Sequence, residues 1–108
     1  IGVAAPSNLA VCVIDNQRYG ETGMQETHTG HGVDLAAMAA GAGFAHTQTA
    51  WTKKDVEEII PHLYETEGPV FIDIKVNTDY VPMVLPMRDG TAIRGRFREA
   101  VLGDRAFD

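Results

Sequence analysis

The stretch LAVCVIDNQRYGETGMQ, residues 9–25, decides how the rest of the chain is interpreted. It opens with an uninterrupted apolar run at residues 9–14, which is typical of a strand covered on both faces in a parallel sheet. Asp15 and Asn16 follow at once and begin a polar, glycine-rich loop over residues 16–32. Loops of this length inside a small domain are usually functional. The order predicts a buried strand whose carboxyl end leads directly into a ligand site.

Beyond this loop, apolar stripes and caps predict an alternation of helices and strands. The predicted elements are a helix from Asp34 to about Ala40 with Asp34 as its N-cap, a strand at residues 44–50, a helix opened by a capping box at residues 52–55, a strand at residues 70–76, and a helix from Thr91 to about Leu102. Such alternation is typical of right-handed crossovers between parallel strands, with helices on the faces of the sheet. The predicted fold class is therefore α/β, and sheets of this kind bind ligands at the carboxyl ends of their strands.

Two details of packing follow from the same patterns. Cys12 lies among apolar neighbours in the first strand, so we expect it to be a small buried residue. In the last helix, Ile93, Phe97, Ala100 and Val101 recur at helical spacing, so we expect these side chains to face inward.

Length and composition limit what the chain can be. Its 108 residues suit one domain, and its net charge of −6 argues against non-specific binding to nucleic acid, which needs a basic face. The single cysteine excludes an internal disulfide and fits a reducing cytoplasm. No apolar run approaches the roughly 20 residues of a membrane span. The chain opens on Ile1 and its first residues resemble a helix tail stopped by Pro6, so we expect one partial domain, residues 1–108, whose N-terminal part is missing.

The side chains of the loop suit a metal and a phosphate. Asn16 offers a neutral carbonyl oxygen just past a rigid strand, and Mg²⁺ prefers hard oxygen ligands of this kind, usually shared with phosphate oxygens. Gly20 and Gly23 allow the backbone to approach a ligand closely, and backbone N–H groups in such turns bind anions. A plain surface loop rich in turn-forming residues remains open as the alternative.

Two histidines in the same loop carry weaker hypotheses. His28 and His31 are three positions apart, a spacing that zinc ligands use, but no third ligand stands at a convincing distance. A histidine also has the pKa for proton transfer near neutrality, so His28 is a candidate acid or base beside the ligand. A polar loop without chemistry is the alternative for both.

Residues 15–25, preceded by residues 8–11, resemble the second half of the thiamine-diphosphate motif. In that family a Gly-Asp-Gly is followed, later in the chain, by a strand ending in Asn-Asn or Asp-Asn. The resemblance is strongest to the diphosphate-binding (C-terminal) domain or β subunit of sulfopyruvate and phosphonopyruvate decarboxylases. Residues 84–90 and 96–98 are similar to the end of those subunits. The resemblance covers essentially the whole chain and implies the thiamine-diphosphate-binding fold.

The resemblance also implies roles for particular residues of the loop. Asn16 would be the side-chain ligand of Mg²⁺, and Arg18 would give its backbone carbonyl to the same ion. Tyr19, Gly20 and Glu21 would lie along the diphosphate. Asp15 would take part in the cofactor site by orienting the turn, without binding the metal directly.

The chain departs from the pattern of the family in three places. It contains no Gly-Asp-Gly, so the anionic metal ligand is absent, and we expect it upstream of Ile1. Met24 stands where glycine is common, which makes the local turn less certain. Glu21 places an acid beside the diphosphate, so its side chain has to point away from it or toward a substrate.

What the resemblance implies for function is a non-oxidative 2-oxo acid decarboxylase, a lyase, with thiamine diphosphate and Mg²⁺ as cofactors. A pyrimidine-binding domain or α subunit would supply the other half of the site, so we expect this chain to be inactive by itself. We further expect a cytoplasmic dimer or higher oligomer, with no nucleic acid and no membrane among its partners. Two alternatives remain: a carboligase similar to acetolactate synthases, and a non-catalytic α/β fragment or interaction domain.

Overall fold

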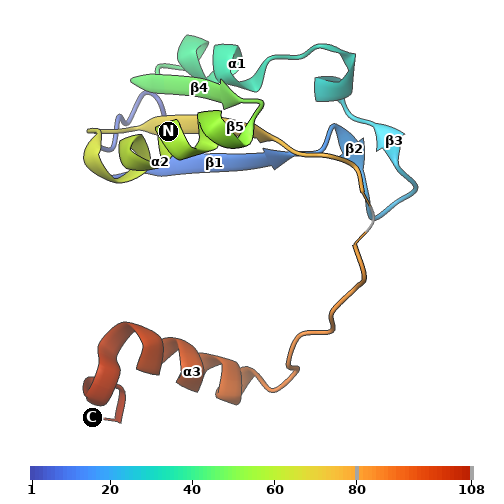
Figure 1. Cartoon of the computed structure of the whole chain (residues 1–108). Helices are drawn as coiled ribbons and strands as arrows, with labels where there is room; N and C mark the ends of the chain where they lie inside the picture. Colours follow the sequence, from blue (N-terminus) through green and yellow to red (C-terminus); the bar gives the residue numbers. More distant parts are fainter. Residues whose placement is uncertain (80, 108) are drawn as a thin grey trace.

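The computed structural model describes residues 1–79 and 81–107, and its centre is a parallel sheet of three strands (Figure 1). The strands are β1 (Ala10–Asp15), β4 (His46–Ala50) and β5 (Val70–Lys75), and their spatial order is β1-β5-β4. Both pairings are parallel, so the carboxyl ends of all three strands meet at one edge of the sheet. The predicted α/β class with a parallel sheet is confirmed.

Two helices connect these strands and cover the sheet. Helix α1 (Leu35–Gly41) joins β1 to β4, and α2 (Lys53–Glu65) joins β4 back to β5. The two connections run in opposite directions across the sheet, so right-handed crossovers place the helices on opposite faces. Both predicted caps are confirmed: Asp34 accepts from the Ala37 N–H at 2.9 Å, and Thr52 and Asp55 form a reciprocal capping box.

The glycine-rich loop has more internal structure than its composition predicted. Strands β2 (Arg18–Tyr19) and β3 (Gln25–Glu26) pair antiparallel, and a 3₁₀ turn, η1 (His28–His31), follows before α1 begins. The loop leaves the carboxyl end of β1, as the sequence indicated. It is a small ordered hairpin beside the sheet (Figure 1).

The expectation that the first strand is covered on both faces is wrong for the described residues, and so is the expectation that Cys12 is buried. Cys12 is exposed, and Ile14 on the same face of β1 is 65% exposed. The reason is that β1 lies at the edge of the sheet, while α2 packs over the other two strands. The core under α2 consists of Ala50, Ile59, Val70 and Ile72.

The last helix does not pack as its apolar spacing predicted. Helix α3 (Gly90–Leu102) and the 3₁₀ turn η2 (Gly103–Phe107) stand apart from the sheet, at the end of an extended segment (Figure 1). Phe97 is 68% exposed, and Ile93 and Val101 are exposed as well. Helix spacing alone cannot say whether an apolar stripe meets its own domain or another surface. None of the helices in the described part of the chain has the length and apolarity that spanning a bilayer requires.

The turn between β2 and β3 depends on a glycine, which gives a test of the loop conformation. Gly23 has φ +124°, and a Cβ there would lie 3.1 Å from Gln25 Nε2. Gly23→Ala is therefore expected to lower the free energy of unfolding by about 1–3 kcal/mol. Chemical denaturation measures this change.

The matched control is Gly41→Ala at the end of α1, where a Cβ would meet nothing within 4 Å. Alanine favours the helical backbone there, so this variant is expected to gain about 0.5–1 kcal/mol. If Gly23→Ala raised the denaturant concentration at the unfolding midpoint, as Gly41→Ala is expected to do, the left-handed conformation of Gly23 would be contradicted.

Candidate functional site

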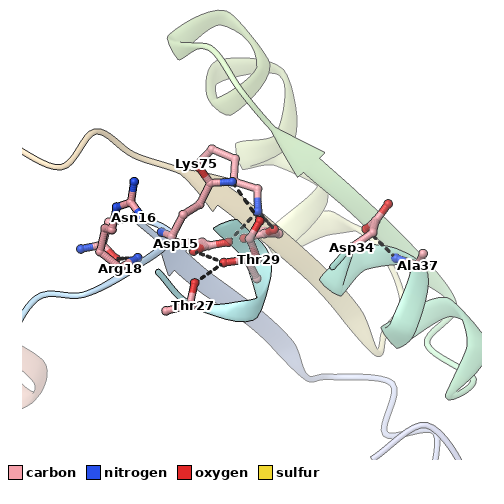
Figure 2. A network of polar contacts seen from close by, with 10 residues as sticks. Asp15, Asn16, Arg18, Thr27, Thr29, Asp34, Ala37 and Lys75 are labelled. Atoms are coloured by element: carbon pink, nitrogen blue, oxygen red, sulfur yellow. Dashed lines mark hydrogen bonds and ion pairs between the residues drawn. The ribbon is translucent and has the colours of Figure 1, made fainter. Parts of the chain in front are cut away.

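The site begins where β1 and β5 end side by side. The parallel register pairs Asp15, the last residue of β1, with Lys75, the last residue of β5. The Lys75 ammonium lies 2.6 Å from Asp15 Oδ2 and 2.8 Å from Asp73 Oδ2, and the contact with Asp15 is drawn in Figure 2. All three side chains are at most 10% exposed, so the ion cluster is largely withdrawn from water.

The charges of this cluster support one another. Burial by itself raises the pKa of the Asp15 carboxyl, but hydrogen bonds from Lys75, Gln17 and Thr29, together with the charge of Lys75, outweigh it, so that pKa lies below its ordinary value. Burial lowers the pKa of the Lys75 ammonium, but its hydrogen bond to Asp15, its close contact with Asp73 and the charges of both carboxylates raise that pKa above its ordinary value. Both groups therefore remain ionised at neutral pH.

The other oxygen of Asp15 holds the turn that follows β1. Asp15 Oδ1 accepts from the Gln17 N–H at 2.7 Å and from Thr29 Oγ1 at 2.9 Å. Figure 2 shows the contact between Asp15 and Thr29. Gln17 has φ 59°, a left-handed conformation that reverses the chain within one residue. Asn16 Oδ1 then accepts from the Arg18 N–H at 2.9 Å, which brings the Asn16 amide beside the backbone of Arg18.

A cavity of about 230 Å³ opens next to this turn. From the loop it is lined by Asn16, Gly20, Glu21 and Met24, and from the segment after β5 by Asn77, Thr78, Asp79, Val81 and Met83. Sequence reasoning missed the second group. The signal was available, because Asn77–Asp79 follow a strand whose carboxyl end lies at the same edge of the sheet, but the strand order was needed to use it.

The structure brings only some of the predicted site residues to this cavity. Asn16, Gly20 and Glu21 line it. Tyr19 lies in β2 and is 52% exposed, and the Arg18 guanidinium turns aside to an ion pair with Glu26. The predicted metal contact of Arg18 uses its backbone carbonyl, so the ion pair does not compete with it.

Asp15 and the two histidines lie outside the cavity. Asp15 is buried beneath the turn, where both its oxygens are engaged, which fits the orienting role that the resemblance implied. His28 starts η1, is exposed and does not line the cavity, so its acid–base role stays a prediction. His31 lies 3.4 Å from Glu26, and the described residues contain no cluster of three or more metal-ligating side chains that would suit the zinc hypothesis.

The donors around the cavity suit a metal that carries a phosphate ligand. A Cβ on Gly20 would meet nothing nearer than Asn16 Nδ2 at 3.7 Å, an ordinary contact, so packing within the chain does not require glycine there. Glycine instead leaves space open beside the Asn16 amide. The Thr22 and Met24 N–H groups donate to the Tyr19 carbonyl, whereas those of Gly20 and Glu21 have no acceptor among the described residues. These two backbone N–H groups belong to residues that line the cavity with Asn16, so they are candidate donors to an anion there.

Comparison with known proteins identifies a family and two similar proteins. Residues 3–74 match the family model described as "Thiamine pyrophosphate enzyme, C-terminal TPP binding domain". The chain is 33% identical over 101 residues to sulfopyruvate decarboxylase subunit beta of Methanocaldococcus jannaschii, a match that covers 87% of this chain and 54% of that subunit. It is 30% identical over 76 residues to phosphonopyruvate decarboxylase of Streptomyces viridochromogenes, covering 70% of this chain and 19% of that enzyme.

The chain thus spans about half of one relative and a fifth of the other. No solved structure matched it. The family match covers most of the sheet and the whole loop after β1, which lines one side of the cavity, and both relatives are decarboxylases by name. The chain therefore belongs to the family of C-terminal TPP-binding domains of thiamine pyrophosphate enzymes.

Proposed function

We propose that this chain holds the diphosphate–Mg²⁺ end of thiamine diphosphate in a non-oxidative 2-oxo acid decarboxylase. The observation that carries the proposal is the cavity that Asn16, Gly20 and Glu21 line together, with the Gly20 and Glu21 N–H groups bonded to no acceptor among the described residues. Family membership supports the cofactor, and the names of the two relatives support the reaction.

The roles of the chain's own residues follow from the metal-ligand atoms and hydrogen-bond donors that they offer. Asn16 Oδ1 and the Arg18 carbonyl would ligate Mg²⁺, and the backbone of Tyr19, Gly20 and Glu21 would receive the diphosphate. When bound, thiamine diphosphate supplies the nucleophile and electron sink for loss of CO₂. The protein holds and orients the cofactor. Asp15 orients the turn that carries these groups.

The charge around the cavity makes the metal essential to binding. Glu21 and Asp79 both line it, and a bare diphosphate would be repelled by these carboxylates. The two ligands proposed for Mg²⁺ within the chain are neutral, so they leave the charge of the ion available to phosphate and to a further anionic ligand. A carboxylate from outside these 108 residues would complete the metal site.

The assembly is part of the same proposal. The match to a protein named as a β subunit suggests that a pyrimidine-binding domain or α subunit faces this one and completes the active site. We propose a dimer or higher oligomer that works in the cytoplasm, where a lone cysteine stays reduced. His28, exposed at the start of η1, is the residue we propose as an acid or base contributed from this side.

The metal role of Asn16 is tested by Asn16→Ala in the protein as its gene encodes it, purified with its partner. Binding of thiamine diphosphate is measured by calorimetry over a series of Mg²⁺ concentrations. The Mg²⁺ needed for half-maximal binding is expected to rise at least about tenfold, since losing even a supporting group of a metal site costs about 10- to 100-fold in affinity.

Asn8→Ala is the matched control, because Asn8 is exposed just before the opposite end of β1. It is expected to bind like the wild type. If Asn16→Ala and Asn8→Ala showed the same Mg²⁺ dependence, Asn16 would not be a metal ligand.

The reaction is tested by supplying sulfopyruvate, phosphonopyruvate and pyruvate in turn to the holoenzyme. CO₂ release and the matching aldehyde are expected from the sulfonated or phosphonated acid, at a higher kcat/KM than from pyruvate. Acetolactate formed from pyruvate would favour the carboligase alternative. Tight binding of thiamine diphosphate without turnover of any 2-oxo acid would favour a non-catalytic domain.

A further inference from the structure

A lysine outside the cavity is held at one point by groups from several elements. Lys75 Nζ contacts the carboxylates of Asp15 and Asp73, and it lies 5.5 Å from the centroid of the Trp51 ring. Asp15 is the end of β1, Asp73 and Lys75 belong to β5, and Trp51 follows β4 directly. The ammonium therefore joins the carboxyl ends of all three strands of the sheet.

Asp73 is the unusual member of this cluster. It is 1% exposed, and its Oδ1 has no hydrogen-bond partner among the described residues. Its Oδ2 lies near the Lys75 ammonium at 2.8 Å, although the angles do not make that contact a hydrogen bond. A carboxylate buried in this way costs free energy, and a well-packed apolar residue would often serve stability as well or better. Its effect here is to give the ammonium a second counter-charge and so to hold it in place.

Asp15 links Lys75 to the turn that is proposed to hold the metal. Lys75 bonds Asp15 Oδ2, which leaves Asp15 Oδ1 aimed at the Gln17 N–H and at Thr29 Oγ1. The first bond closes the turn over Asn16, and the second ties the far end of the hairpin, beyond Arg18, to the same carboxylate. Without the ammonium, Asp15 would be a buried carboxylate free to turn toward other donors, and the turn would lose its fixed geometry.

We propose that Lys75, held by Asp73, is a positioning residue for the metal site: through Asp15 it sets the geometry of Asn16 and Arg18. This inference rests on the proposed function, because it concerns the same Mg²⁺–diphosphate site. Lys75 touches neither cofactor nor substrate in this scheme. Its effect is therefore on metal affinity, with kcat preserved once Mg²⁺ and thiamine diphosphate are saturating.

The test compares Lys75→Met and Lys75→Arg in the gene-encoded protein with its partner. Lys75→Met is expected to raise the Mg²⁺ concentration for half-maximal binding of thiamine diphosphate by about 10- to 100-fold, the usual effect of losing a supporting group. Lys75→Arg is expected to recover part of this loss, because it keeps the positive charge. Lys75 lines a second cavity, of about 340 Å³, so there is room for the longer side chain. Lys53→Met, at a lysine 91% exposed on α2, is the matched control and is expected to leave binding unchanged.

Each outcome is decisive. A folded Lys75→Met whose Mg²⁺ dependence stays within twofold of the wild type would overturn the inference. If Lys75→Met does not fold, Asp73→Asn is used instead, because it keeps the Lys75–Asp15 pair and nearly the same side-chain shape. A several-fold rise in its Mg²⁺ requirement would support the inference. An unchanged Mg²⁺ requirement would overturn it. A wild-type protein that binds no thiamine diphosphate at any Mg²⁺ concentration would instead overturn the proposed function, and this inference with it.

Discussion

The ion pair between Lys75 and Asp15 fixes the point at which the sheet meets its functional loop. The parallel register of β1 and β5 places these two residues side by side, although sixty positions separate them in the chain. Because Asp15 uses one oxygen for Lys75 and the other for the turn, the sheet and the hairpin share a single buried carboxylate. Asn16 follows Asp15 directly, so we propose that its position, and with it the metal site, depends on this arrangement.

The electrostatics of the site divide into two regions with different tasks. Beneath the turn, buried charges are paired and remain ionised, so they act as fixed structure. At the cavity, Glu21 and Asp79 face the space in which an anion is proposed to bind, and the candidate metal ligands are neutral. In the function proposed here, such a cavity would discriminate against a bare diphosphate and in favour of its Mg²⁺ complex. The separation explains how a chain of net charge −6 can be adapted to an anionic cofactor.

Local signals in the sequence predicted the local parts of the fold well. Asp34 and the capping box at Thr52 marked two helix starts correctly, and the polar residues after β1 indicated the loop that lines the cavity. The errors and omissions concern contacts between distant segments. The burial of Cys12 and the inward face of the last helix required knowing which surfaces other elements cover, and periodicity does not contain that information. The roles of Lys75 and of Asn77–Asp79 required the strand order, which brings β5 beside β1.

We propose above that the loop after β1 holds a metal between Asn16 and Arg18. The most direct test is anomalous diffraction from crystals of the gene-encoded protein with its partner, grown with thiamine diphosphate and with Mn²⁺ in place of Mg²⁺. The expected result is a Mn²⁺ peak within ligand distance of Asn16 Oδ1 and the Arg18 carbonyl, with the diphosphate along Gly20 and Glu21. A Mn²⁺–diphosphate complex bound away from residues 16–21 would contradict the claim.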